Sequence, residues 1–175
     1  MELSLTRPLC FFDLETTGVN VAKDRVVEIS ILKVFPNGNK ESKTWLVNPE
    51  MPIPPQTTAV HGITDEKVAN EPTFKQLSKD IYSMIKGSDL AGFNSDRFDI
   101  PLLAEEMLRA EIDVDFKKHL TVDVQTIFHK MEKRNLSAAY KFYCGKDLDN
   151  AHSAEADTNA TYEVLKSQIE KYDEL

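Results

Sequence analysis

The sequence has few cysteines and no long hydrophobic run. Cys10 and Cys144 are its two cysteines, and Cys10 falls in an apolar segment, which argues against a disulfide framework. No run approaches the roughly eighteen apolar residues that a membrane span needs. The first residues also lack the charged-then-apolar layout of a secretory signal. We therefore expect a cytoplasmic protein with no membrane association.

The sequence also lacks an excess of positive charge. Its 21 Lys and Arg residues stand against 29 Asp and Glu residues, which gives a formal net charge of −8. This balance argues against a protein that coats nucleic acid over its whole surface. It is compatible with an enzyme that grips one end of a strand through bound cations. The length of 175 residues and the apolar share of 41% predict a single globular domain, residues 1–175.

A short apolar segment ends in two carboxylates. Residues 9–12 (LCFF) predict a buried strand, and Asp13 and Glu15 follow two positions apart, on one face of that strand. Like charges near a core repel and lose hydration, which a cation between them would relieve. Oxygen ligands favour hard ions such as Mg²⁺ or Mn²⁺. The alternative is a strand that reaches the surface at Asp13 and continues into a solvated turn.

The rest of the chain predicts a mixed α/β fold. Residues 25–35 and 43–48 flank the turn sequence PNGN and predict antiparallel strands beside the first. Further strands are expected at 90–94 and 119–122, and helices at 74–85, 99–107, 123–133, 136–144 and 153–172. Four prolines between 49 and 55 predict an extended loop, and Thr73 with Gln76 fits a capping box. This order predicts three antiparallel strands, then parallel strands, in one sheet flanked by α-helices.

Two further acids occupy positions that suit a metal site. Asp99 starts a predicted helix directly after a strand, where the helix dipole favours a carboxylate; a simple N-terminal capping acid is the alternative. Asp157 shares a predicted apolar stripe of the last helix with Ala160, Thr161, Val164 and Leu165. A carboxylate on an apolar stripe is costly unless it is paired or bound to a metal.

His152 precedes Asp157 by five residues. Within one helix the two side chains would point in nearly opposite directions. If His152 lies instead in the loop before an N-cap at Ser153, it reaches the same place as Asp157. A histidine beside such a cluster suits a general base, because its pKa falls near neutral pH. The alternative is an exposed loop histidine with no role.

Three segments of the chain together resemble the motifs of the DEDDh family of 3′–5′ exonucleases, the group of the polymerase III epsilon subunit and RNase T. These segments are residues 12–18 (FDLETTG), 94–99 (NSDRFD) and 152–157 (HSAEAD). The resemblance spans about residues 8 to 168. It implies a ribonuclease H-like fold, two divalent metal ions (Mg²⁺ or Mn²⁺) and stepwise 3′→5′ release of nucleoside monophosphates.

The resemblance also implies roles for individual residues. Asp13, Glu15, Asp99 and Asp157 would be the metal carboxylates, and His152 would be the base. Residues 59–64 resemble the family's nucleotide-contacting loop. The side chains expected to meet the terminal nucleotide are Leu14, Thr16, Thr17, His61, Phe93 and Phe98. Core packing is the alternative for the two phenylalanines.

One position departs from the family pattern. Asp123 falls where many members have Asp-Thr or Asp-Ser, but Val124 follows it here. Its role is therefore left open, as a supporting residue at most.

The expected partners are the 3′ ends of single-stranded DNA or RNA. Little chain follows the last predicted helix, which favours a stand-alone nuclease over a polymerase-bound proofreader. Two other functions are considered. A haloacid dehalogenase-like phosphatase normally has Asp as its second acid, so Glu15 does not fit. An inactive nucleic-acid-binding or polymerase-docking module does not need the full set of four acids and His152. The sugar preference, the metal used in the cell, the oligomeric state and any polymerase partner are left open by the sequence.

Overall fold

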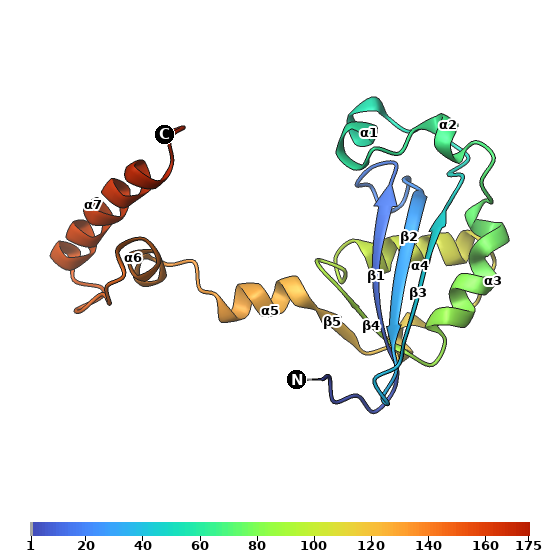
Figure 1. Ribbon diagram of the computed structural model, residues 1–175, viewed down its shortest axis with the longest axis horizontal. Coiled ribbons are helices and arrows are strands. Elements are labelled where there is room, and N and C mark those ends of the chain that lie inside the picture. The colour runs from blue at the N-terminus through green and yellow to red at the C-terminus, as the bar shows by residue number, and fades with distance from the viewer. Residues whose placement is uncertain (1) are drawn as a thin grey trace. The chain divides into compact units, whose positions relative to one another are not determined.

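The computed structural model describes residues 2–175, which form two compact units. The first unit extends to Thr126 and the second comprises Ile127–Leu175. Figure 1 labels the elements along the chain. The strands are β1 (Leu9–Thr16), β2 (Val26–Val34), β3 (Lys40–Leu46), β4 (Asp89–Gly92) and β5 (Thr121–Asp123). The helices are α1 (Pro55–His61), α2 (Asp65–Val68), α3 (Phe74–Ile85), α4 (Asp99–Arg109), a short 3₁₀ turn (Phe116–Lys118), α5 (Val124–Met131), α6 (Leu136–Cys144) and α7 (Ala154–Lys171).

The five strands form one mixed sheet in the order β3-β2-β1-β4-β5. β1 pairs antiparallel with β2, and β2 pairs antiparallel with β3. β4 is parallel to β1, and β5 is parallel to β4. The predicted mixed sheet, with three antiparallel strands followed by parallel ones, is confirmed.

Side chains of β1 alternate between two faces of the sheet. Cys10, Phe12 and Leu14 are buried in the main core, together with residues of α3 and α4 such as Ile81 and Leu102. Figure 1 shows these two helices beside the sheet. Because successive strand residues point to opposite faces, Asp13 and Glu15 are directed away from this core.

Local sequence chemistry sets several helix ends as predicted. The capping box before α3 is confirmed: the backbone N–H of Thr73 donates to Gln76 Oε1 at 2.9 Å, and the backbone N–H of Gln76 donates to Thr73 Oγ1 at 3.3 Å. α4 begins at Asp99. α6 ends at Cys144, where Gly145 adopts a left-handed φ of +68° that suits glycine.

The proline-rich segment differs from its prediction. An extended loop was expected through residue 55, but Pro55 is the first residue of helix α1 and Pro54 is its N-cap. Proline is tolerated in a first turn because its φ already suits the helix and its missing N–H has no partner there. The strand expected at 119–122 is also displaced, to Thr121–Asp123.

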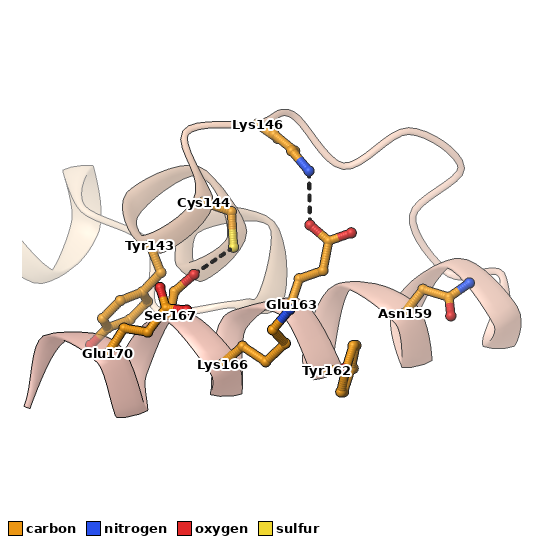
Figure 2. Close-up of a pocket in the computed structure, with 9 residues that line it drawn as sticks. All are labelled: Tyr143, Cys144, Lys146, Asn159, Tyr162, Glu163, Lys166, Ser167 and Glu170. Carbon is orange, nitrogen blue, oxygen red and sulfur yellow. Dashed lines mark hydrogen bonds and ion pairs between the residues drawn. The ribbon is translucent and has the colours of Figure 1, made fainter.

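The second unit is built on the packing of α6 against α7. Figure 2 shows the facing side chains, with an ion pair between Lys146 Nζ and Glu163 Oε2 at 2.9 Å. Ala160 and Val164 of α7 are buried, whereas Thr161 and Leu165 are exposed, so the buried stripe is narrower than predicted. No helix among residues 2–175 combines the length and the apolar character needed to cross a membrane.

Candidate active site

Asp13 and Glu15 stand side by side on the same face of β1. Asp13 is exposed and Glu15 is half-buried. Across the β1–β2 ladder, Ser30 lies opposite Asp13, and Glu28 lies opposite Glu15. Burial and the charge of Asp13 raise the pKa of Glu15; His61 lowers it, and Glu28 raises it further. Glu28 was not identified from the sequence, because only the strand register brings it opposite Glu15.

Asp99 is more buried than Asp13 and Glu15. It opens α4 and is 5% exposed. Desolvation and the charge of Asp13 raise its pKa to about 6. Hydrogen bonds from the backbone N–H groups of Leu14 and of Asp99 itself act in the opposite direction and lower the pKa. The Asp99 carboxylate therefore lies beside the β1 backbone, within electrostatic range of Asp13.

Asp13, Glu15 and Asp99 are three acids of the first unit that are linked electrostatically through Asp13. Burial is the main cause of the raised pKa values of Glu15 and Asp99, and the charge of Asp13 raises both further. Their donor chemistry fits a hard divalent cation, which would favour the ionised forms. Among residues 2–175, no group of three or more His, Cys, Asp or Glu side chains is arranged so that it could hold a metal ion.

Thr16, the last residue of β1, and Thr17 after it use their hydroxyl groups to build the adjoining loop. Thr16 Oγ1 donates to the carbonyl of Gly18 at 2.6 Å. Thr17 Oγ1 donates to Asp24 Oδ1 at 2.8 Å and accepts the backbone N–H of Arg25 at 3.0 Å. A Cβ on Gly18 would lie 2.6 Å from Asp24 Oδ2, so this close approach requires glycine. Both threonine side chains are buried, and they fix the backbone immediately after the acid pair.

His61 is positioned at the end of α1 by two hydrogen bonds. Its Nδ1 accepts the backbone N–H of Ile63 at 3.0 Å, which places the ring proton on Nε2, 3.1 Å from the carbonyl of Thr16. Both ring nitrogens are therefore engaged within the first unit, and the ring links α1 to the end of β1. What His61 offers to a ligand is the face and edge of the ring.

The remaining predicted contact residues differ in exposure. The Leu14 side chain lies in the main core, and Leu14 presents only its backbone to the acids. Phe93 is 60% exposed in the loop after β4, whereas Phe98 is half-buried and packs against the core. Of these side chains, only that of Phe93 offers a free aromatic surface for stacking.

A buried ionic network joins α4 to the loop after β1. The carboxylate of Glu106 is fully buried and receives hydrogen bonds from Arg25 and Arg109. Arg109 also donates to the backbone carbonyls of Ala22 and Asp24. This network was not predicted from the sequence. The available signal was a glutamate in the apolar stripe that contains Leu103 and Met107.

The two predicted site residues of the second unit lie next to each other. His152 is in the turn before α7, in the predicted loop position, with a left-handed φ of +75°. Its backbone N–H donates to Asp157 Oδ1 at 3.3 Å. Ser153 is the N-cap residue, but its side chain makes no capping bond. Asp157 thus holds the turn that presents the exposed His152 side chain.

The second unit also contains an open cavity of about 770 Å³ between α6 and α7. Figure 2 labels the nine residues that line it, among them Cys144, Glu163 and Lys166. Its lining is mixed in charge, and Cys144 Sγ lies 3.6 Å from Ser167 Oγ. None of the residues predicted to act in the reaction lines this cavity.

Comparison with known proteins identifies relatives over most of the chain. A DNA polymerase III subunit epsilon from Treponema pallidum is 30% identical over 170 residues, covering 90% of this chain and 74% of the relative. A 3′–5′ exonuclease DinG from Staphylococcus haemolyticus is 28% identical over 93% of this chain, which spans 18% of that longer protein.

Solved structures show the same fold. The zinc-bound form of an Escherichia coli exonuclease I complex with single-stranded DNA matches with a TM-score of 0.65 at 19% identity, over 94% of this chain and 41% of that protein. The ribonuclease H-like architecture expected from the sequence is therefore confirmed. The RNase_T family model, described as an exonuclease, matches residues 10–165. The chain belongs to this exonuclease family.

Proposed function

We propose that this protein is a metal-dependent 3′→5′ exonuclease that releases nucleoside monophosphates from the ends of single-stranded nucleic acid. The observation that carries the proposal is the pair Asp13 and Glu15 on one face of β1 together with Asp99, which is buried and whose pKa is raised to about 6 by burial and by the charge of Asp13. A chain retains such mutually repelling acids where a cation is to be held.

Asp13, Glu15, Asp99 and Asp157 are the proposed metal carboxylates, and His152 is the proposed base. Asp157 and His152 join this set through the resemblance of their motif, and their mutual contact within the second unit supports their acting together. Two hard divalent ions, Mg²⁺ or Mn²⁺, would supply an activated water and neutralise charge on the phosphate. His152 accepts a proton from the attacking water, and its exposed position before α7 leaves the imidazole free to do so.

The terminal nucleotide is held by residues around the end of β1. Thr16 and Thr17 hold the backbone beside the acids, and the ring of His61 covers that backbone. Phe93 stacks on a base with its exposed ring. Phe98 and Leu14 support these contacts from the core side.

The proposed context is a single exonuclease domain, residues 1–175, acting on DNA or RNA 3′ ends. The exonuclease I complexes contain single-stranded DNA, which supports a single strand as the substrate. Both cysteines are free thiols, which suits a reducing compartment such as the cytoplasm.

Cleavage of labelled single strands tests this proposal. Single-stranded DNA and RNA of one sequence, labelled at the 5′ end, are incubated with Mg²⁺ or Mn²⁺. The expected products form a ladder shortened from the 3′ end, with mononucleotides released. Asp13→Asn should abolish the ladder, and Asp80→Asn, which changes an exposed acid of α3, should not.

The other outcomes identify the alternatives. Binding of the strand without cleavage at any metal concentration indicates the nucleic-acid-binding module instead. Internal cuts, or free phosphate as the first product, contradict an exonuclease.

A further inference from the structure

Asp123 is a buried acid that the proposed reaction does not use. It is the last residue of β5 and is 6% exposed. Its Oδ1 accepts backbone N–H groups of Asn94 at 2.9 Å, Gln125 at 3.0 Å and Thr126 at 3.4 Å. Its Oδ2 accepts the backbone N–H of Asp96 at 3.2 Å. The carboxylate is thus occupied by four backbone donors and is not free to act as a metal ligand.

Two of these donors belong to the first turn of α5, and two belong to the loop between β4 and α4. The bonds to Gln125 and Thr126 are an ordinary helix cap. The bonds to Asn94 and Asp96 hold the loop itself, and this loop leads directly into Asp99. The loop also contains Asn94 in a left-handed conformation, with a φ of +58°.

The opposite side of the same loop is packed equally closely. A Cβ on Gly92 would lie 2.6 Å from the Cβ of Ser95 and 3.2 Å from the carbonyl oxygen of Phe12. Ser95 is fully buried, and its carbonyl accepts the backbone N–H of Ile100 at 2.9 Å. The loop is therefore clamped between β1 and Asp123, and Asp99 follows at its end.

We propose that Asp123 is a positioning residue that fixes the Asn94–Asp99 loop, so that Asp99 is held beside Asp13 for metal binding. This inference rests on the proposed function. Burial raises the pKa of Asp123, but hydrogen bonds from the backbone N–H groups of Asp96, Asn94, Thr126 and Gln125 lower it by more, so the carboxylate stays ionised and keeps its four donors. Asp99 thus receives its position from a residue on the far side of β4, whose charge also raises the pKa of Asp99.

Asp123→Asn separates the two roles of the side chain, which caps α5 and also binds the Asn94–Asp99 loop. If the amide oxygen takes the place of Oδ1, it keeps the bonds to Asn94, Gln125 and Thr126, including the helix cap. The amide nitrogen then faces the N–H of Asp96, so a donor opposes a donor. The reverse orientation would oppose three donors and is disfavoured. The substitution therefore disturbs the loop next to Asp99 and leaves the helix cap intact.

The test measures Mn²⁺ binding by calorimetry, together with cleavage as a function of metal concentration. For Asp123→Asn we expect metal affinity to fall about tenfold, with cleavage recovering as the metal concentration is raised. Asp115→Asn is the control, because Asp115 also caps a short helix through the N–H of Lys117 but does not contact the loop. Its metal affinity should equal that of the wild type.

Unchanged metal affinity and metal dependence in Asp123→Asn would overturn the inference and leave Asp123 as a helix cap, while the proposed function stands. A wild-type protein that neither binds Mn²⁺ nor cleaves would overturn both. Amide hydrogen exchange in the wild type keeps the test decisive if the variant fails to fold. Protection of the Asn94 and Asp96 amides is expected, and exchange of both at the rate of free amides would contradict the clamp.

Discussion

At the residue scale, Asp99 couples the stability of the fold to the proposed metal site. Its carboxyl group is buried beside Asp13, and its pKa is about 6 in the folded protein, against about 3.9 in an unfolded chain. The folded state therefore binds this proton more tightly than the unfolded state does. Ionised Asp99 destabilises the metal-free protein, and stability is lost as the pH rises from about 4 to above 6.

Asp99→Asn should therefore stabilise the metal-free protein in a pH-dependent way. The amide removes the charge and can still accept the N–H of Leu14. We expect the free energy of unfolding to rise by roughly 1–3 kcal/mol at about pH 8 and to change little at about pH 4. Urea denaturation in the presence of a chelator measures both values. Asp80→Asn on the surface of α3 is the control, and an equal gain at both pH values would contradict the explanation.

Some residue positions could be predicted from the sequence and others could not. The two-residue period of a strand is sufficient to place Asp13 and Glu15 on one face. It does not reveal Glu28, because the β1–β2 register depends on how the intervening loop folds. It also does not reveal that the Thr16 and Thr17 hydroxyls are engaged in that loop.

At the scale of elements, α4 organises the first unit around the acids. Its first residue is Asp99, and Glu106, two turns later, joins Arg25 and Arg109 in the buried network. Through this network α4 holds the loop that follows β1. The acid pair and Asp99 thus depend on the same helix for their relative positions.

Glu106→Gln should destabilise the protein. The neutral amide removes the buried counter-charge of two arginines that are themselves 21% and 27% exposed, and Arg25 keeps its ion pair with Glu50, so we expect a loss of about 1–3 kcal/mol. Glu105→Gln is the matched control, since Glu105 is the preceding residue of α4 and forms no ion pair with the described residues 2–175. Thermal and urea denaturation measure the difference. Equal stability of the two variants would show that the network does not hold the loop.

Element boundaries were predictable where local chemistry determines them. The α3 capping box and the end of α6 at Gly145 follow from a few adjacent residues. Helix α1 was missed because a proline-rich sequence excludes a helix interior but not a first turn. The role of Asp123 was missed because its loop partners, Asn94 and Asp96, lie about thirty residues earlier in the chain.

At the scale of the whole molecule, the family match extends across both compact units. It covers residues 10–165, whereas the boundary between the units falls after Thr126. The first two motifs lie in the first unit, and His152 and Asp157 lie in the second. The order of the motifs in the sequence is the signal on which the proposal of one shared reaction rests. The contacts within each unit do not show such a link between the motifs.

Net charge predicts how this molecule binds its substrate. A protein with a formal net charge of −8 has no excess of cations for a long phosphate track. We expect it to grip only the last nucleotides, with help from Arg97, which is exposed in the loop before Asp99. For about two to four neutralised phosphates, the logarithm of affinity should fall against the logarithm of salt concentration with a slope of about −1.4 to −2.8.

Fluorescence anisotropy with a 3′-terminal phosphorothioate strand, which resists cleavage, measures this slope. Arg97→Gln should make it shallower by about 0.7, the share of one phosphate contact on a single strand. Lys79→Gln on the exposed surface of α3 should leave it unchanged. Affinity should also stop rising once the strand exceeds about four nucleotides, because further phosphates meet no additional cations. A slope steeper than about −5, or affinity that still rises beyond about a dozen nucleotides, would require an extended basic groove and would contradict end binding.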